Sequence, residues 1–170
     1  MKKNKLLSAF LVALIATAVL HSIAEAKGLY FTIWWFDILT HFGGGATVGF
    51  GSLWFGCRIG LFPPAGVSET TMWGIRIIYE KGIPSWATCC VMLVGISIFA
   101  PVWELWEVIM RESFGLTWVG MPYPTEYVPD TLSDLMTGFS GAIIAWAVAH
   151  KVEWVVWKEP KENVQIAEQH

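Results

Sequence analysis

Residues 36–50 read FDILTHFGGGATVGF, a glycine-rich apolar run that contains one acid and one histidine. Asp37 and His41 are spaced i, i+4, so in a helix they stack on one face. The run belongs to a longer apolar stretch from Leu29 to Gly56, and about 20 helical residues suffice to cross a bilayer core. Lipid offers backbone groups no hydrogen-bond partners, so such a stretch is expected to be helical. The sequence therefore predicts a membrane helix with a polar pair inside it.

The composition of the whole chain also favours a membrane protein. Of its 170 residues, 55% are hydrophobic and 15% are charged, whereas an average soluble domain has about 25% charged residues. The chain has 11 tryptophans, and membrane interfaces collect amphipathic rings. Its formal charge of -3 offers no basic surface, so nucleic-acid binding is not expected.

Four apolar stretches are long enough to span a bilayer as helices. They lie at Leu6 to Ala24, Leu29 to Gly56, Pro84 to Met110 and Thr131 to Trp157. We therefore expect one all-α domain over residues 1–158, a polytopic bundle of four transmembrane helices, followed by a polar cytoplasmic tail over 159–170. The first stretch also fits a cleavable signal peptide, because basic residues precede it and Ala24-Glu25-Ala26 ends it. Cleavage would leave three spans.

Basic residues favour one orientation of these helices, because cytoplasmic flanks retain Lys and Arg. Of the 11 basic residues, only Lys27 and Arg111 fall on the side opposite the others. Both termini are therefore expected in the cytoplasm, in a multi-pass protein of the cell membrane. The segment Thr71 to Lys81 would then be cytoplasmic, either as an amphipathic stretch along the membrane interface or as a plain connecting loop.

Ionisable residues inside the spans are informative, because each costs at least about 2.5 kcal/mol near the bilayer centre unless it is paired or hydrated. Three pairs share single helix faces by their spacing: Asp37 with His41, Glu104 with Glu107, and Asp130 with Asp134. The alternating directions of the spans place all three pairs toward the outer leaflet. Their convergence would form a cluster of carboxylates and one imidazole that opens outward and is closed below by apolar helix.

Small residues continue the polar faces of these helices. One stripe contains His41, Gly45 and Gly49, and another contains Asp134, Gly138, Gly141 and Ala145. Small side chains permit close helix approach in lipid. The polar faces are therefore expected to point into the bundle rather than toward lipid.

A cluster of this charge needs shared protons or a cation, because like charges at close range disfavour one another's ionisation. Carboxylate oxygens with one imidazole suit a divalent Mg, Mn, Fe or Zn ion. The Glu-x-x-His signature of di-metal bundles is absent from these helices. We interpret four residues as metal ligands and two as alternative general bases: Asp37, His41, Glu104 and Asp134 for the metal, and Glu107 or Asp130 for the base.

Two of the pairs also have structural interpretations. Thr131 followed by Asp134 fits a helix capping box, and Asp130 fits an N-cap. Glu107 fits an ion pair with Arg111, which lies one helical turn later. Neither interpretation requires a ligand.

The remaining polar residues leave similar alternatives open. Asp37 and His41 fit a self-contained pair, whereas Glu104 has no such partner in its own helix. His21, near the outward end of the first span, fits either a further ligand or an ordinary interfacial residue. Aromatic residues between the third and fourth spans would form an apolar lid over the site: Trp118, Tyr123 and Tyr127.

Three short motifs carry a resemblance to known families. In chain order they are Trp35-Phe36-Asp37-Ile38-Leu39-Thr40-His41-Phe42-Gly43-Gly44, Glu104-Leu105-Trp106-Glu107, and Asp130-Thr131-Leu132-Ser133-Asp134-Leu135 with Gly138 and Gly141-Ala142. Over residues 35–145 the chain resembles the VanZ-like and YjdF-like families of small bacterial integral membrane proteins. VanZ-like proteins usually carry Glu-x-x-Gln where this chain has Glu104 and Glu107, so the YjdF-like group is nearer. The resemblance implies a multi-span helical protein with an Asp/His/Glu/Asp constellation, but no particular reaction.

These features are compatible with three functions. The first is a metal-dependent membrane enzyme, hydrolytic in type, that acts on a lipid or lipid-linked substrate from the outer leaflet. The second is a cation or proton transporter, because intramembrane acids also serve ion pathways. The third is a non-catalytic partner or assembly protein that uses polar groups to hold helices together. Polar lining on both sides of the cluster would favour transport, whereas a closed lower end would favour an enzyme or a binding site.

Overall fold

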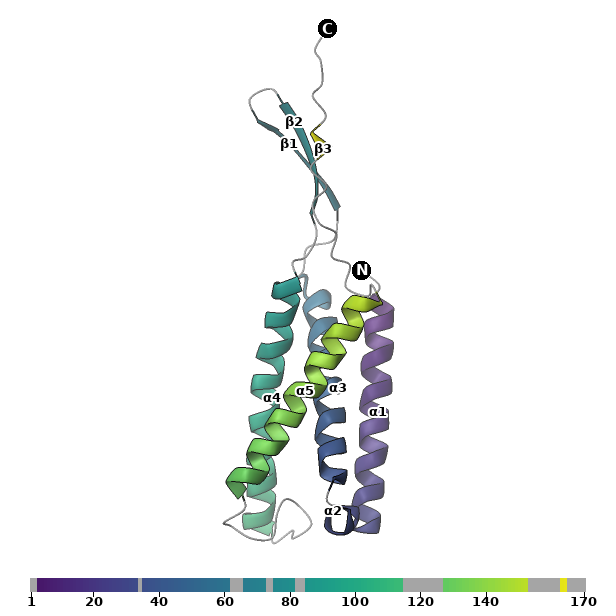
Figure 1. Cartoon of the computed structure of the whole chain (residues 1–170), viewed down its shortest axis with the longest axis vertical. Helices are drawn as coiled ribbons and strands as arrows, with labels where there is room; N and C mark the ends of the chain where they lie inside the picture. The colour runs from purple at the N-terminus through teal and green to yellow at the C-terminus, as the bar shows by residue number, and fades with distance from the viewer. Residues whose placement is uncertain are drawn as a thin grey trace.

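The computed structural model describes residues 3–33, 35–61, 66–72, 75–81, 85–114, 127–152 and 163–164. Four long helices form a bundle, with a short helix at one end and short strands beyond the other (Figure 1). The helices are α1 (Lys3–Lys27), α2 (Leu29–Thr32), α3 (Phe36–Arg58), α4 (Ser85–Phe114) and α5 (Tyr127–Lys151). The strands are β1 (Gly66–Met72), β2 (Ile75–Lys81) and β3 (Asn163–Val164).

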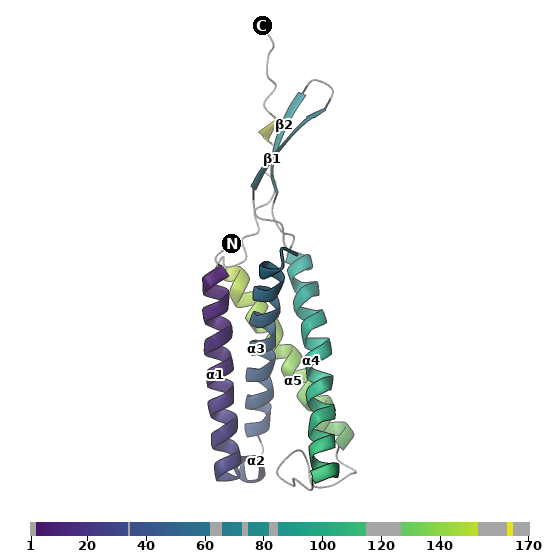
Figure 2. The same cartoon turned by 180° about the vertical axis from the view of Figure 1, so that it is seen from behind.

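Helix α3 is the central element of the bundle. It packs against α1, α4 and α5, as the view from behind also shows (Figure 2). The chain runs alternately up and down through α1, α3, α4 and α5, so α3 and α5 point in the same direction (Figure 1). The start of α1 and the end of α5 therefore lie at one end of the bundle, and α2 lies at the other.

The predicted second span, Leu29 to Gly56, begins too early. Gly28 has a φ of 63°, in the left-handed region that favours glycine, and it separates α1 from the short helix α2. Ile33 is extended and donates its N–H to the Leu29 carbonyl over 2.8 Å. Helix α3 starts only at Phe36, because the chain reverses direction through Gly28 and α2 before it re-enters the bundle.

Three described helices are long and apolar enough to cross a membrane: Asn4–Lys27, Trp86–Phe114 and Val128–Lys151. They expose large apolar side chains such as Val12 (68%), Phe99 (61%) and Val128 (78%), which in water would be an aggregation hazard. This pattern supports the predicted helical, multi-pass membrane protein. Helix α3 does not meet the same criterion, because six of its 23 residues are glycine and it also carries Asp37 and His41.

Helices α3 and α5 touch through their backbones. A Cβ on Gly45 would collide with the carbonyl oxygen of Gly138, and a Cβ on Gly141 would collide with the carbonyl oxygen of Phe42. One turn beyond Gly45, a Cβ on Gly49 would lie 3.0 Å from Cα of Ala142. The two glycine and alanine stripes predicted from the sequence therefore pack directly against each other.

The segment between α3 and α4 contains a β-hairpin. Strands β1 and β2 pair antiparallel, from Gly66 opposite Lys81 to Met72 opposite Ile75, and β3 pairs with β2. The β2 sequence IRIIYEK is rich in β-branched residues, which fit a pleated strand. The interpretation of Thr71 to Lys81 as a plain loop is therefore wrong, whereas its position along the membrane interface stays a prediction. The all-α description holds for the bundle alone.

The contact between Gly45 and Gly138 yields a prediction about stability. Substitution Gly45→Ala forces a methyl group against the α5 backbone, and overpacking of this kind costs about 1–3 kcal/mol. For a chain of this size each kcal/mol lowers Tm by about 2–4 °C. Thermal unfolding in detergent measures the change.

The matched control is Gly44→Ala at the preceding position of α3, where an added Cβ meets nothing within 4 Å. This variant should keep or slightly raise Tm, because alanine favours helix over glycine by about 1 kcal/mol. Equal Tm values for the two variants would contradict the proposed α3–α5 contact.

Candidate functional site

His41 lies in the second turn of α3, with its side chain 13% exposed. Its neighbour on the same helix face is Asp37, whose Oδ1 is 3.4 Å from Nε2 of His41. The i, i+4 spacing brings these two groups together, as the sequence pattern predicts. The pair is not self-contained, however, because acids from two other helices face the same imidazole.

Asp134 reaches the same ring nitrogen from α5. Its Oδ2 is 3.7 Å from Nε2 of His41, and only 4% of its side chain is exposed. Asp134 precedes Gly138 by one turn just as His41 precedes Gly45 by one turn, and α3 and α5 run in the same direction. The close glycine contact therefore sets the height at which Asp134 meets His41.

Two glutamates from α4 also lie close to His41. Glu104 Oε1 lies 3.9 Å from Nδ1 of His41. Glu107 joins His41 and Glu104 in a second group of possible ligand atoms. The indole N–H of Trp103 donates to Glu107 Oε1 over 2.7 Å.

The imidazole therefore lies between two sets of carboxylates. In each set the possible ligand atoms lie within 4.8 Å of one another: Asp37, His41 and Asp134 in the first, and His41, Glu104 and Glu107 in the second. The structure thus brings together all four predicted metal ligands and one of the two predicted bases. Three helices supply them, and within the described residues His41 is the one basic group paired with these acids.

Asp130 occupies a more peripheral position. It belongs to neither group, although it is close enough to Glu104 and Asp134 to act on both electrostatically. Helix α5 begins at Tyr127, so Asp130 lies in its first turn and Thr131 lies inside the helix. The N-cap and capping-box interpretations of Asp130, Thr131 and Asp134 are therefore wrong.

Two predictions fall outside the described residues. The proposed ion pair between Glu107 and Arg111 involves a side chain that the structure does not describe. The same holds for the aromatic lid of Trp118, Tyr123 and Tyr127.

His21 has partners that the sequence reading did not anticipate. Its Nε2 lies 3.0 Å from Glu25 Oε1, and its Nδ1 lies 2.5 Å from the hydroxyl of Tyr30 in α2. Its ring forms a T-shaped contact with the Trp103 ring, with 6.0 Å between ring centroids. The i, i+4 spacing of His21 and Glu25 was a usable signal, whereas the contact with Tyr30 depends on the chain reversal at Gly28.

A second polar group lies at the opposite end of the bundle. Thr88, which is fully buried, accepts a hydrogen bond from the Trp146 indole N–H over 3.0 Å. Its hydroxyl lies 2.8 Å from Nε2 of His150. His150 therefore links the end of α5 to α4 through Thr88.

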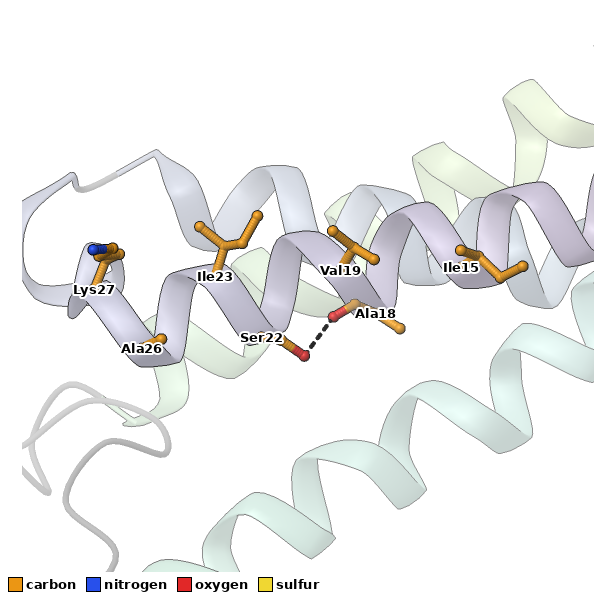
Figure 3. Close-up of a pocket in the computed structure, with 7 residues that line it drawn as sticks. All are labelled: Ile15, Ala18, Val19, Ser22, Ile23, Ala26 and Lys27. Carbon is orange, nitrogen blue, oxygen red and sulfur yellow. Dashed lines mark hydrogen bonds between the residues drawn. The ribbon is translucent and has the colours of Figure 1, made fainter.

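A shallow groove on α1 does not contain any of these groups. Ile15, Val19 and Ile23 project along one side of the helix, and Lys27 closes the groove at its end (Figure 3). Ser22 also lines it and donates its hydroxyl to the Ala18 carbonyl over 2.9 Å. The groove is apolar and open, so it has none of the chemistry of the cluster around His41.

A family model described as "Predicted membrane protein (DUF2238)" matches residues 1–154. The chain belongs to this family. The match confirms the membrane class, and the resemblance to YjdF-like proteins is consistent with it, whereas nothing in the match supports the resemblance to VanZ-like proteins. No curated protein and no solved structure matches the chain.

The arrangement around His41 predicts strong coupling between His41 and Asp134. Removing one member of a buried ion pair costs about 3–5 kcal/mol, because the other charge loses its partner. His41→Gln and Asp134→Asn should each destabilise the protein, and the double variant should be less destabilised than the sum. We expect a coupling free energy of about 1–3 kcal/mol from unfolding in mixed detergent micelles. Strictly additive effects would show that the two side chains do not interact.

Proposed function

We propose that His41, Asp37 and Asp134 bind a divalent metal ion. The observation that carries the proposal is the approach of two carboxylate oxygens, from Asp37 and Asp134, to within 3.4 and 3.7 Å of the same ring nitrogen. Ligands about 2.1 Å from a tetrahedral ion are separated from one another by about 3.4 Å. The spacing of the three donors therefore suits one ion with little rearrangement, and Mg, Mn, Fe and Zn all accept such ligands.

In this proposal Glu104 orients His41 instead of binding the ion directly. Its carboxylate faces Nδ1, the nitrogen that Asp37 and Asp134 do not approach. A ligating histidine usually presents its second nitrogen to a carboxylate, which fixes the tautomer and raises ligand basicity. The position of Glu104 favours this role over the ligand role that its sequence position suggested.

Glu107 is the better of the two predicted candidates for a general base. It belongs to the same group as Glu104 and His41, and the Trp103 indole N–H donates to one of its oxygens. In this proposal the Glu107 carboxylate accepts a proton from a water molecule at the cluster. Asp130 lies farther out and would tune the charge of the cluster.

We propose hydrolysis of a lipid or lipid-linked substrate as the reaction of this site. A bound divalent ion would supply an activated water molecule and polarise the substrate. Each role would belong to residues of this chain. Asp37, His41 and Asp134 would bind the ion. Glu104 would orient the His41 ring, and Glu107 would accept a proton from the water molecule. The cluster lies toward the α2 end of the bundle, between apolar helices, where a lipid substrate can approach laterally.

We further propose four membrane spans, with α3 included, and cytoplasmic termini in the cell membrane. The alternating directions of the four long helices support it (Figure 1). Lys5, Arg58 and Lys151 lie at one end of the bundle, whereas Lys27 lies at the other, which agrees with a cytoplasmic end rich in basic residues. The cluster would then face outward.

Contacts of α1 favour its retention as a span over its removal as a signal peptide. Phe10 stacks on Trp54 of α3 with 6.2 Å between ring centroids. Leu6 is fully buried, and a Cβ on Gly43 would come within 2.6 Å of the Thr17 hydroxyl. Removing α1 would expose this side of α3.

Transport is less well supported, because the bundle is apolar below the cluster. Leu53, Met92, Ile96 and Ala142 form the buried core between α3, α4 and α5. They separate the cluster from the polar group of Thr88 and His150 at the other end. Thr47 is a buried polar residue of α3, but its hydroxyl donates to the Gly43 carbonyl of its own helix.

A purely structural role is the second candidate, and one observation favours it. His41 lies within ion-pair distance of acids on its own helix, on α4 and on α5. A protonated His41 would hold these three helices together without any ligand. The amount of metal bound to the purified protein distinguishes the metal site from this structural role.

Elemental analysis of the detergent-purified protein tests the metal proposal. Wild type should carry about one equivalent of a divalent metal per chain, and Asp37→Ala and Asp134→Ala should lose it. Glu104→Gln should weaken binding by about 10–100-fold without abolishing it. The control Glu112→Gln removes an exposed acid of α4 and should retain the metal. Absence of stoichiometric metal from wild type would leave the structural role.

The orientation is tested with reporter fusions. A fluorescent protein fused to either terminus should fold and fluoresce, because both termini are proposed to be cytoplasmic. A periplasmic phosphatase fused after Phe114 should be active, since that end of α4 is proposed to face outward. An inactive phosphatase at that position, together with an active one at the C-terminus, would reverse the orientation.

A further inference from the structure

A second cluster, formed by Glu25, His21 and Tyr30, adjoins the first but shares no residue with it. The three side chains form a line: Glu25 Oε1 is 3.0 Å from Nε2 of His21, and Nδ1 of His21 is 2.5 Å from the Tyr30 hydroxyl. We propose that Tyr30 is a nucleophile activated by His21 and oriented by Glu25, for attack on an acyl ester at the membrane surface. The proposal does not require the metal site.

The order of the three groups determines the position of the protons. An ionised carboxylate only accepts hydrogen bonds, so Nε2 of His21 carries the proton that faces Glu25. Nδ1 of the neutral ring is then an acceptor, and the Tyr30 hydroxyl donates to it. A hydroxyl bonded to an imidazole that a carboxylate orients is the arrangement that generates nucleophiles in hydrolytic triads.

The surroundings of Tyr30 make the base necessary. Burial is the main cause that raises the pKa of Tyr30 to about 12. The Thr40 hydroxyl lowers this pKa, and the negative charges of nearby acids raise it further. The hydroxyl is therefore protonated at neutral pH, and it becomes nucleophilic only when a neighbouring group removes its proton. His21 is the group in position to do so.

The same surroundings indicate the class of substrate. Asp37, Glu25 and Glu107 are close enough to act electrostatically on Tyr30. Their negative charge would repel a phosphoryl group more strongly than an uncharged carbonyl. Tyr30 is half-buried and lies in α2, just beyond the apolar helix α1, so an acyl ester of a lipid is the substrate that the position fits.

The proposed step conserves atoms and charge. The Tyr30 oxygen bonds to the carbonyl carbon while its proton moves to Nδ1 of His21. The leaving alcohol departs with that proton, which leaves an acyl-tyrosine. Water then attacks this ester and gives its proton to Nδ1, and the tyrosine oxygen recovers that proton as the acid is released.

Labelling with an aryl sulfonyl fluoride tests the proposal without knowledge of the substrate. The probe reacts with tyrosines whose proton is removed by a nearby base, and peptide mapping by mass spectrometry locates it. The full-length protein in detergent should be labelled at Tyr30 at least about tenfold faster than at Tyr79, Tyr123 or Tyr127. His21→Gln should slow labelling of Tyr30 by about 100-fold, in the range of general base catalysis, and Glu25→Gln should slow it less.

A neighbouring hydroxyl supplies the matched control. Ser22→Ala removes an exposed side chain of α1 that bonds only its own helix in the structure, and it should leave the labelling rate of Tyr30 unchanged. Thermal unfolding of every variant shows that it is folded, and a labelling rate is compared only between folded variants. Equal labelling of Tyr30 and the other tyrosines, or fast labelling of Tyr30 in folded His21→Gln, would overturn the proposal.

The outcome is independent of the metal proposal. Labelling in the presence of a chelator should proceed at the same rate, because none of the three groups is a proposed metal ligand. Loss of Tyr30 labelling on chelation would show that its reactivity depends on the metal, and would overturn the independent triad. Selective labelling of Tyr30 in a purified protein that contains no metal would refute the metal site and support the proposed role of Tyr30.

Discussion

The backbone contact between α3 and α5 is the constraint on which the site depends. Because Gly45 and Gly138 have no side chains, the two helices approach until their backbones touch. They run in the same direction, so one turn toward the start of each helix places His41 against Asp134. A larger residue at Gly45 would separate the helices and with them the two donors. The glycines are therefore as much part of the site as the polar residues.

Charge balance is the second constraint on this bundle. One imidazole faces carboxylates from three helices, in surroundings where an unpaired ionised group is costly. A protonated His41 compensates one negative charge, so further protons or a cation must compensate the rest. With a cation at Nε2, the Nδ1–H of His41 would donate a hydrogen bond to Glu104. A protonated ring would instead donate from Nδ1 toward Glu104 and from Nε2 toward Asp37 and Asp134. The same geometry thus supports a metal site and a structural ion-pair network, which differ in what occupies the space between Asp37 and Asp134.

Helical periodicity was sufficient to predict which residues meet inside the bundle. The spacings of Asp37 with His41 and of Glu104 with Glu107 placed each pair on one face, and the glycine stripes placed the faces of His41 and Asp134 inward. The sequence did not reveal which nitrogen of His41 each acid approaches, because that depends on helix offsets of a few ångströms. It also concealed the break between α2 and α3, because apolar residues continue from Leu29 past the start of α3 at Phe36. The β-hairpin was missed because β-branched residues in a short segment also fit an interfacial stretch.

The distribution of polar groups along the bundle limits where chemistry can occur. The cluster around His41 and the line from Glu25 to Tyr30 both lie toward the α2 end, and the buried core below them is apolar. Trp103 separates the two groups: its indole N–H is bonded to Glu107, and it meets His21 through a ring contact only. The two groups still influence each other, because the negative charges of Asp37 and Glu107 act on Tyr30, so a change of charge in one group alters the proton affinity of the other.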